Sequence, residues 1–377
     1  PNPKHNTMRR RLYAAIDLHS RTSVLGWMGE RGKMIDTIRF ETTEDNLREK
    51  VGALRAKEIR LTIEAAPLAR WAAGILRPLV TRLIVCDARR NRLVSCAANK
   101  GDEVDTESLC RLLRLDEIHA VWMSDNEGRQ IFRETVFDLL KLRDRQRELK
   151  TLIKNRFRAQ GVLRLNGTEI FHPVKRRRWI DQVPEAHRHG LLVIYGLFDT
   201  ALAAWREQLR EVRRLGAAFP EIARFQEVPG IGEIGAAVFC AIIEDPHRFK
   251  TASQLYRYSA LGITSRSSDN KPLGYEKLER RGQRELKNLS YHAWRTGIRS
   301  GSQCEVVRRF YLASKQRTGS ARHGRLNTQR KILKTLLRIW QNNSRFDPKL
   351  FLQNPTPQPA SGRRRRGRPR RPRSRKG

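Results

Sequence analysis

Short apolar runs alternate with polar turns along the first quarter of the chain and predict a mixed sheet. Runs at Leu12–Leu18, Ser23–Met28 and Met34–Phe40 are separated by short polar segments, which is typical of an antiparallel β-meander. The pattern then predicts a helix, a strand, a helix and a strand, near 44–56, 59–64, 68–80 and 82–86. We therefore expect a mixed sheet with helices packed against it.

In the rest of the chain the spacing of apolar residues indicates helices. Apolar residues recur at helical spacing over 127–158 and again over 178–215, among dense Arg, Lys and Glu. The pattern predicts a long helical hairpin that joins two domains, and it also permits a role in dimerisation or nucleic-acid contact. We predict an α/β domain over 11–123, a helical coiled-coil region over 124–218, an all-α domain over 219–351 and a disordered tail over 352–377.

Charge narrows the class of partner. The chain of 377 residues has 77 Lys and Arg against 39 Asp and Glu, a formal net charge of +38. A polyanion is the expected partner. No run approaches the roughly 18 apolar residues that span a bilayer, so we expect a soluble, intracellular protein with no membrane partner. The tail over 362–377 has ten Lys or Arg and no acidic residue, which favours a polyanion-binding role.

The cysteines and histidines do not indicate a metal site. The five cysteines form no CxxC pair and lie mostly in apolar runs, so we expect reduced, buried thiols. The histidines lack ligand spacing and are interpreted as structural or surface groups.

Four carboxylates of the first domain are the candidate catalytic residues. Asp17 lies within an apolar strand and Glu64 ends another, and each position is costly for a charge unless a cation compensates it. Asp102 and Asp105 are spaced i, i+3 at the start of a helix and share one face. If that face meets the sheet, four carboxylates converge, a ligand set that suits Mg²⁺, or Mn²⁺, for phosphodiester chemistry. Alternatively, Asp17 caps a turn or binds an Arg, and the helix-start acids complement the dipole.

Two segments of the second domain are candidate nucleic-acid contacts. Gly230 and Gly232 lie in the turn Val228-Pro229-Gly230-Ile231-Gly232 before an apolar helix. This turn resembles a helix-hairpin-helix motif, which holds a backbone phosphate, although an ordinary Gly-rich turn is the alternative. Further along, the polar loop Leu261–Pro272 contains a run of serines. Cations that could stabilise charge near an attacking serine follow or lie within it: Arg266, Lys271, Arg280 and Arg281. A solvated turn is the alternative for this loop.

Taken together, these features resemble the DEDD transposases of insertion sequences, a family that includes Piv-type DNA invertases and bridge-RNA-guided recombinases. The resemblance rests on the acidic set, the Gly-rich turn and the serine loop, and it covers roughly residues 11–300. The strand and helix order of the first domain is that of the ribonuclease-H-like (RuvC-like) fold. The family's serine precedes a glycine pair and a lysine. Here the stretch is Ser268-Asp269-Asn270-Lys271, which makes Ser268 the first choice and Ser267 the second.

The resemblance implies a transposase or site-specific DNA recombinase. Asp17, Glu64, Asp102 and Asp105 would hold Mg²⁺, and Ser268 would attack DNA to form a covalent phosphoserine intermediate. It also implies homodimers or homotetramers, a structured guide RNA, and a bacterial cytoplasmic, nucleoid-associated location. Two other hypotheses stay open: a RuvC-like Mg²⁺-dependent nuclease that uses activated water, and a non-catalytic nucleic-acid-binding protein.

Overall fold

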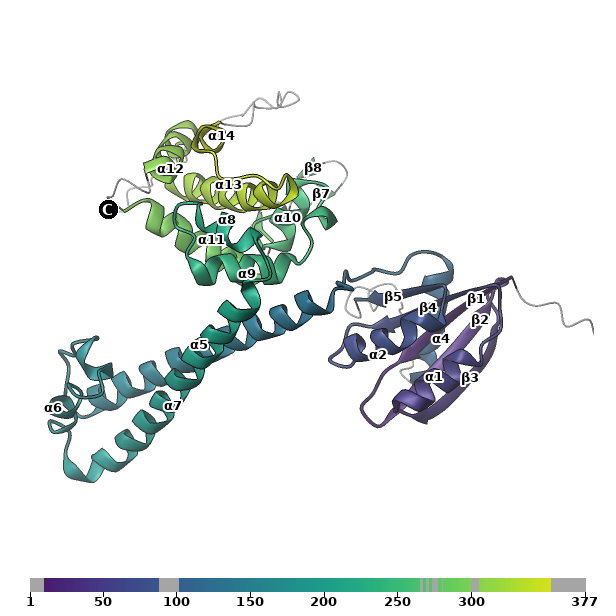
Figure 1. Ribbon diagram of the computed structural model, residues 1–377, viewed down its shortest axis with the longest axis horizontal. Coiled ribbons are helices and arrows are strands. Elements are labelled where there is room, and N and C mark those ends of the chain that lie inside the picture. The colour runs from purple at the N-terminus through teal and green to yellow at the C-terminus, as the bar shows by residue number, and fades with distance from the viewer. Residues whose placement is uncertain are drawn as a thin grey trace, which may run out of the picture. The chain divides into compact units, whose positions relative to one another are not determined.

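The fold was analysed in a computed structural model that describes residues 10–87, 102–264, 267–268, 271–272, 277–279, 281–299 and 305–353. For residues 102, 103, 267, 268, 271 and 272 the backbone alone is described. The chain divides into two compact units, residues 1–123 and 124–377 (Figure 1).

Unit 1 contains a five-stranded mixed sheet. Its strands are β1 (Arg11–Asp17), β2 (Thr22–Gly29), β3 (Met34–Glu41), β4 (Glu58–Glu64) and β5 (Arg82–Cys86). Their order across the sheet is β3-β2-β1-β4-β5, with β1, β2 and β3 antiparallel and β1, β4 and β5 parallel. The predicted mixed sheet is confirmed, and its order is compatible with a ribonuclease-H-like domain.

Alternation along the strands assigns the helices to opposite faces of this sheet. Leu12, Ala14 and Ile16 of β1 form one core with α1 (Glu44–Gly52) and α2 (Ala69–Leu76), which a 3-10 turn at Arg77–Leu79 extends. Ala15 of β1 packs on the other face against α4 (Asp102–Arg114). Because successive side chains of a strand point to opposite faces, β1 is buried on both.

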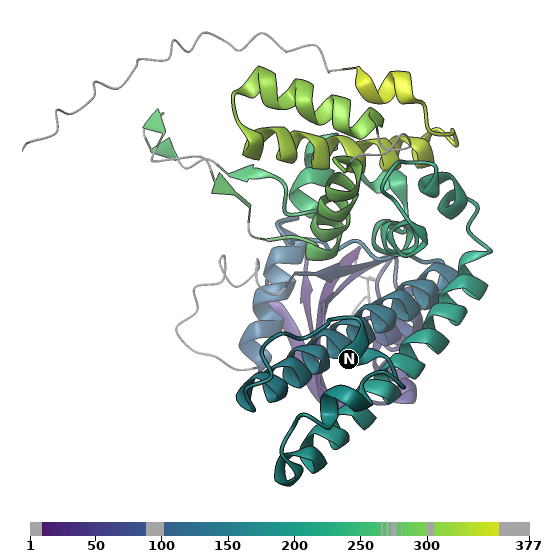
Figure 2. The ribbon, with the colours of Figure 1, turned by 90° about the vertical axis from the view of Figure 1, so that its left-hand side faces the viewer.

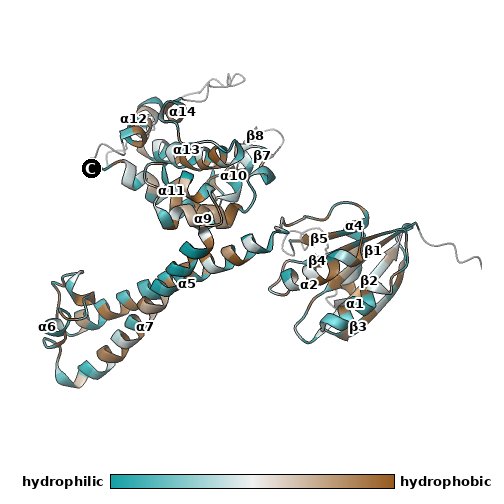
Figure 3. Cartoon of the chain, viewed as in Figure 1, coloured by the Kyte–Doolittle hydropathy of each residue, from teal (hydrophilic) through white to brown (hydrophobic). Residues whose placement is uncertain are grey.

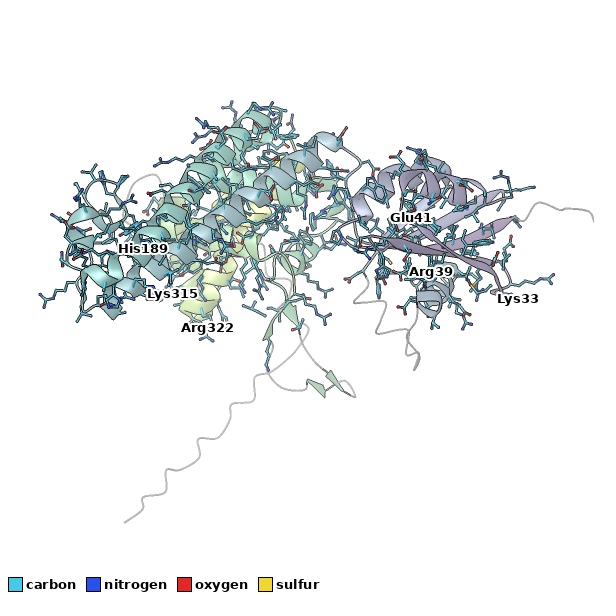
Figure 4. The ribbon with its side chains drawn as sticks, turned by 90° about the horizontal axis from the view of Figure 1, so that it is seen from below. Lys33, Arg39, Glu41, His189, Lys315 and Arg322 are labelled. Atoms are coloured by element: carbon cyan, nitrogen blue, oxygen red, sulfur yellow. The ribbon has the colours of Figure 1, made fainter. Side chains whose placement is uncertain are left out.

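β3 forms one edge of the sheet. Asp36, Arg39 and Glu41 are exposed along it, and Arg39 and Glu41 are labelled in Figure 4. Charged side chains on an edge strand oppose pairing with another chain. The other edge, β5, extends through a bridge between Cys86 and Ala120.

Unit 2 carries a two-helix arm formed by α5 (Glu127–Ala159) and α7 (Glu185–Gly216), which lie side by side (Figure 1). The helix predicted over 178–215 begins later, because the short α6 (Arg177–Ile180) ends and Pro184 caps α7 in an extended conformation. A small core closes the tip, around the 3-10 turn Glu169–Phe171, where the Tyr195 hydroxyl donates to the Ile170 carbonyl over 2.7 Å. Within the described ranges no helix is both long and apolar enough to cross a membrane.

The rest of unit 2 is a helical core around α9 (Glu233–Ile243), whose residues from Ala236 onward are buried and which is largely hydrophobic in Figure 3. Around it pack α8 (Glu221–Gln226), α11 (Arg284–Gly297), α12 (Glu305–Thr318) and α13 (Ala321–Gln341), the last two side by side (Figure 2). The remaining elements are a 3-10 turn at Pro246–Arg248, α10 (Ala252–Tyr258) and α14 (Pro348–Leu352).

The predicted serine loop contains two short antiparallel ladders, which sequence did not predict. β6 (Ile263–Thr264) pairs with β9 (Lys277–Leu278), and β7 (Ser267–Ser268) pairs with β8 (Lys271–Pro272). Two-residue strands have no alternation long enough to recognise.

Cys86, Cys110 and Cys240 are buried thiols, as predicted. Burial raises the pKa of Cys110 to about 12 and also raises the pKa of Cys240 well above its usual value. Cys96 and Cys304 lie outside the described residues.

Candidate functional site

Two of the four predicted acids are neighbours at one end of the sheet. β1 and β4 are parallel, with Ile16 opposite Ile63, and Asp17 and Glu64 are the next residue of each strand. Both side chains are half-buried. Two adjacent carboxylates repel each other unless a cation or proton compensates them.

The orientation of α4 brings its N-terminus to the same end. The Cys110 thiol donates to the Gly26 carbonyl over 3.4 Å, and Gly26 pairs with Ala15. One turn later, Leu113 packs against Tyr13, nearer the start of β1. The helix therefore runs opposite to β1, and its first turn, which holds Asp102 and Asp105, lies towards the end where β1 and β4 finish.

The four acids are not a closed cluster. Asp105 is exposed, and the side chain of Asp102 is not described. Among the described side chains, no group of three or more His, Cys, Asp or Glu is close enough to hold a metal ion. The oxygen donors fit Mg²⁺ by their chemistry.

Sequence reasoning missed one neighbour of this site. His19 Nε2 lies 3.1 Å from Asp17 Oδ2, although the histidines were interpreted as structural or surface groups. Its side chain is 60% exposed, so it can reach solvent and a substrate from this position. The only available signal was its place two residues after Asp17.

The Gly-rich turn of unit 2 is built tightly. It joins α8 to α9, and Gly230 has φ +85°, a conformation that favours glycine. A Cβ at Gly230 would lie 2.5 Å from the Ala293 carbonyl oxygen of α11. Gly232 precedes α9, with its own Cβ position open.

A small cavity of about 200 Å³ opens beside this turn. Gly230, Gly232 and Gly235 line it together with Arg143 of α5, whose guanidinium lies 3.3 Å from the Glu285 carboxylate. Glu285 lines the same cavity, so the backbone of the first turn of α9 faces a space in which Arg143 already has a carboxylate partner.

The base of the serine loop is fixed by contacts from several elements. Buried Leu261 accepts hydrogen bonds through its carbonyl from Arg330 of α13, at 2.9 Å from Nε and 2.5 Å from Nη2. Glu279 N donates to the Gly262 carbonyl over 2.9 Å. Gly282 has φ +132°, and a Cβ there would lie 2.7 Å from the Tyr258 carbonyl oxygen. The loop therefore leaves and re-enters the core through a closely packed neck.

The predicted serine and lysine are paired within the loop. Ser268 is opposite Lys271 in the β7–β8 register, and Ser267 is opposite Pro272. Arg281 is exposed, while Arg266 and Arg280 lie outside the described residues.

A basic cleft of about 730 Å³ adjoins the neck. Ile263 and Lys277 of the β6–β9 ladder line it, and Tyr291 contributes an aromatic surface. Its other cationic lining residues are Lys287, Arg322 and Arg325, and the described residues that line it include no Asp or Glu. Sequence reasoning missed Arg322 and Arg325, because nothing local connects α13 with a loop 50 residues earlier.

Part of the chain is similar to known transposases. Residues 222–311 match the model of the transposase IS116/IS110/IS902 family. The chain is also 27% identical over 218 residues to the transposase for insertion sequence element IS1111A of Coxiella burnetii (strain RSA 493 / Nine Mile phase I), which covers 54% of this chain and 56% of that protein. The chain thus spans just over half the length of this curated relative. Over these segments the chain is similar to insertion-sequence transposases of the IS116/IS110/IS902 family.

Proposed function

We propose that this protein is a transposase that cleaves and rejoins DNA through a serine nucleophile and a Mg²⁺-dependent acidic site. The observation that carries the acidic half is the β1–β4 register, since it makes Asp17 and Glu64 neighbours at one end of the sheet. The first turn of α4, with Asp102 and Asp105, lies towards the same end. Mg²⁺, or Mn²⁺, held by these four acids would neutralise charge on phosphate oxygens.

The neck of the serine loop and its basic cleft support the nucleophilic half. Ser268 is the proposed nucleophile and Ser267 the second choice. Lys271, opposite Ser268 in the ladder, would favour the developing negative charge, together with Arg266, Arg280 and Arg281. The cations of the cleft, including Lys287, Arg322 and Arg325, would hold the DNA backbone close by.

The proposed reaction has two phosphoryl transfers. The Oγ of Ser268 attacks a DNA phosphorus and loses its proton, an Oγ–P bond forms, and one P–O bond of the strand breaks to release a hydroxyl end. In rejoining, the hydroxyl of another strand attacks the phosphoserine and the serine leaves. Each step exchanges one phosphate ester for another, so the sequence requires no external energy source.

The remaining parts of the proposal concern binding and assembly. The α8–turn–α9 unit would act as a helix-hairpin-helix element in which Gly230 and Gly232 let α9 present its amides to a phosphate. The α5–α7 arm would act as a coiled coil in a homodimer or homotetramer. A structured RNA would supply sequence specificity, with the protein in the bacterial cytoplasm at the nucleoid.

A denaturing gel tests the proposal directly. Purified protein is incubated with Mg²⁺, candidate RNA from the element and labelled DNA that carries the element's ends and target. We expect a covalent protein–DNA adduct that disappears in Ser268→Ala and persists in Ser253→Ala, an exposed serine on α10.

Each other outcome has a defined meaning. Loss of the adduct in Ser267→Ala alone keeps the mechanism and moves the nucleophile by one residue. Cleavage without an adduct, unchanged in both loop variants, identifies a nuclease that uses water. If the wild-type protein itself does not cleave the DNA, and Asp17→Asn binds it as well as the wild type does, the protein is a non-catalytic binding protein.

A further inference from the structure

After Glu305, the first residue of α12, the charged side chains of α12 and α13 are all Lys or Arg. From Val306 to Phe346 the sequence contains eleven Lys or Arg and no Asp or Glu. Most of this segment lies beyond residues 222–311, which match the family model. The serine-loop cleft uses Arg322 and Arg325, near the start of α13.

A second cavity lies further along α13, where α12 and α14 approach it. Its volume is about 370 Å³, and Arg317, Lys334 and Arg338 contribute to its walls with Tyr256 and Phe310. The described residues that line this cavity include five cations and no carboxylate. Lys334 and Arg338 are spaced i, i+4, so they lie on one face of α13.

Two of the five cations, Lys331 and Arg330, have structural roles. Lys331 Nζ donates to the carbonyls of Leu350 and Gln353 over 3.0 and 2.9 Å, which satisfies the C-terminal end of α14. Arg330 is similarly engaged at the neck of the serine loop. Arg317, Lys334 and Arg338 have no ion pair with a described residue.

These cations repel one another in the free protein. Burial, followed by the charges of Lys334 and Arg338, lowers the pKa of Lys331 to about 8. Burial and Arg338 also lower the pKa of Lys334. Lys331 and Lys334 are half-buried, whereas Arg317 and Arg338 are exposed. Like charges gathered around one cavity without counter-charges destabilise a fold, so their presence is typical of a site that receives an anion.

We propose that the cleft lined by Arg317, Lys334 and Arg338 binds phosphodiester groups of a nucleic-acid backbone, as a contact separate from the serine-loop cleft. The inference rests on the proposed function only in taking nucleic acid as the ligand. Point cations and a guanidinium recognise phosphate without reading sequence, so the cleft would position the nucleic acid and leave site choice unchanged.

The test measures binding of the full-length protein without Mg²⁺, so that it does not depend on strand cleavage. The variant Lys334→Gln/Arg338→Gln is compared with Arg31→Gln/Lys33→Gln, which removes two exposed cations from the β2–β3 turn. The probes are a random-sequence DNA duplex and, separately, an RNA hairpin. Affinity is followed over a range of salt concentrations.

We expect the Lys334/Arg338 variant to bind at least one probe on the order of tenfold more weakly and to lower the salt slope by about 2, one for each phosphate contact. Its melting temperature should stay equal or rise, since repulsion is relieved. A merely structural role would lower the melting temperature. Lys334→Arg should retain binding.

A loss of affinity for the DNA duplex alone or for the RNA hairpin alone identifies the nucleic acid that the cleft binds. A slope equal to that of the Arg31/Lys33 control with both probes overturns the proposal. Because the assay requires no adduct, a lowered slope in a protein that forms no adduct would keep this site while refuting the serine mechanism.

Discussion

The carboxylates of the two units occupy different environments. Residues 1–123 contain 22 Lys and Arg against 16 Asp and Glu, whereas residues 124–377 contain 55 against 23. In unit 2 the buried acids are held by arginines of α5. Arg129 Nη1 lies 2.9 Å from Glu221, and Arg133 Nη1 lies 3.1 Å from Glu244.

In unit 1 the acids at the sheet end have the opposite arrangement. Asp17 and Glu64 are placed beside each other, and Asp17 contacts a histidine. A half-buried or buried carboxylate can be compensated by a fixed arginine, as in unit 2, or by an exchangeable cation, as the proposed Mg²⁺ site at Asp17 and Glu64 would require.

The largest expected effect is the loss of DNA cleavage on substitution of Asp17. Asp17→Asn should lower DNA cleavage by about 10³-fold or more, because the substitution removes an oxygen of the proposed Mg²⁺ site, where charge would develop. The melting temperature should stay equal or rise, since repulsion with Glu64 is relieved. Asp36→Asn, on the exposed edge of β3, serves as the control and should keep full activity. A lower melting temperature in Asp17→Asn would indicate that Asp17 stabilises the fold, as Glu221 does in unit 2.

Glu221 should behave in the opposite way. Glu221→Gln leaves the Arg129 guanidinium without its carboxylate, so the free energy of unfolding should fall by about 3–5 kcal/mol in chemical denaturation. Glu207→Gln, an exposed member of an i, i+3 pair, should change it by about 0.5 kcal/mol or less. Equal changes in the free energy of unfolding would show that the buried Arg129–Glu221 pair does not stabilise unit 2.

The Gly-rich turn provides a smaller and purely steric test. Gly230→Ala introduces a Cβ 2.5 Å from the Ala293 carbonyl at φ +85° and should lower the free energy of unfolding by about 2 kcal/mol. Gly232→Ala meets no atom within 4 Å and should change it by less than about 1 kcal/mol. Thermal or chemical unfolding of both variants shows whether close packing against Ala293 requires glycine at position 230.

The smallest expected effect appears at high pH in unit 1. Burial raises the pKa of Cys110 from 9.0 to about 12, so the folded state binds its proton more tightly than the unfolded state. The resulting stability is complete below pH 9 and is lost as the pH rises towards 12. Chemical denaturation at pH 8 and pH 10 should therefore show a smaller decrease in Cys110→Ala than in wild type. Identical pH dependence in the two proteins would contradict this assignment.

The fold of unit 1 could be predicted because polar turns separate its short apolar runs. The position of Glu64 at a strand end followed from the same pattern. Asp17 was expected inside its strand and instead ends β1, where the register makes it a neighbour of Glu64. The direction of α4 could not be predicted, since it depends on contacts such as Cys110 with Gly26.

Much of the site in unit 2 could not be predicted, because it depends on contacts between residues far apart in the sequence. Arg330 donates to the Leu261 carbonyl across 69 residues, and α13 supplies cations to both clefts. The start of α7 differs from the prediction for a local reason. Apolar periodicity predicted one helix from residue 178, but the backbone constraint at Pro184 separates α6 from α7.

Mass spectrometry of the trapped protein–DNA adduct tests the central claim most directly. After digestion of protein and DNA, we predict a nucleotide attached to Ser268, formed with Mg²⁺ and absent in Asp17→Asn or after chelation. An attachment outside the serine loop, or DNA cleavage that leaves every serine unmodified, would contradict the account.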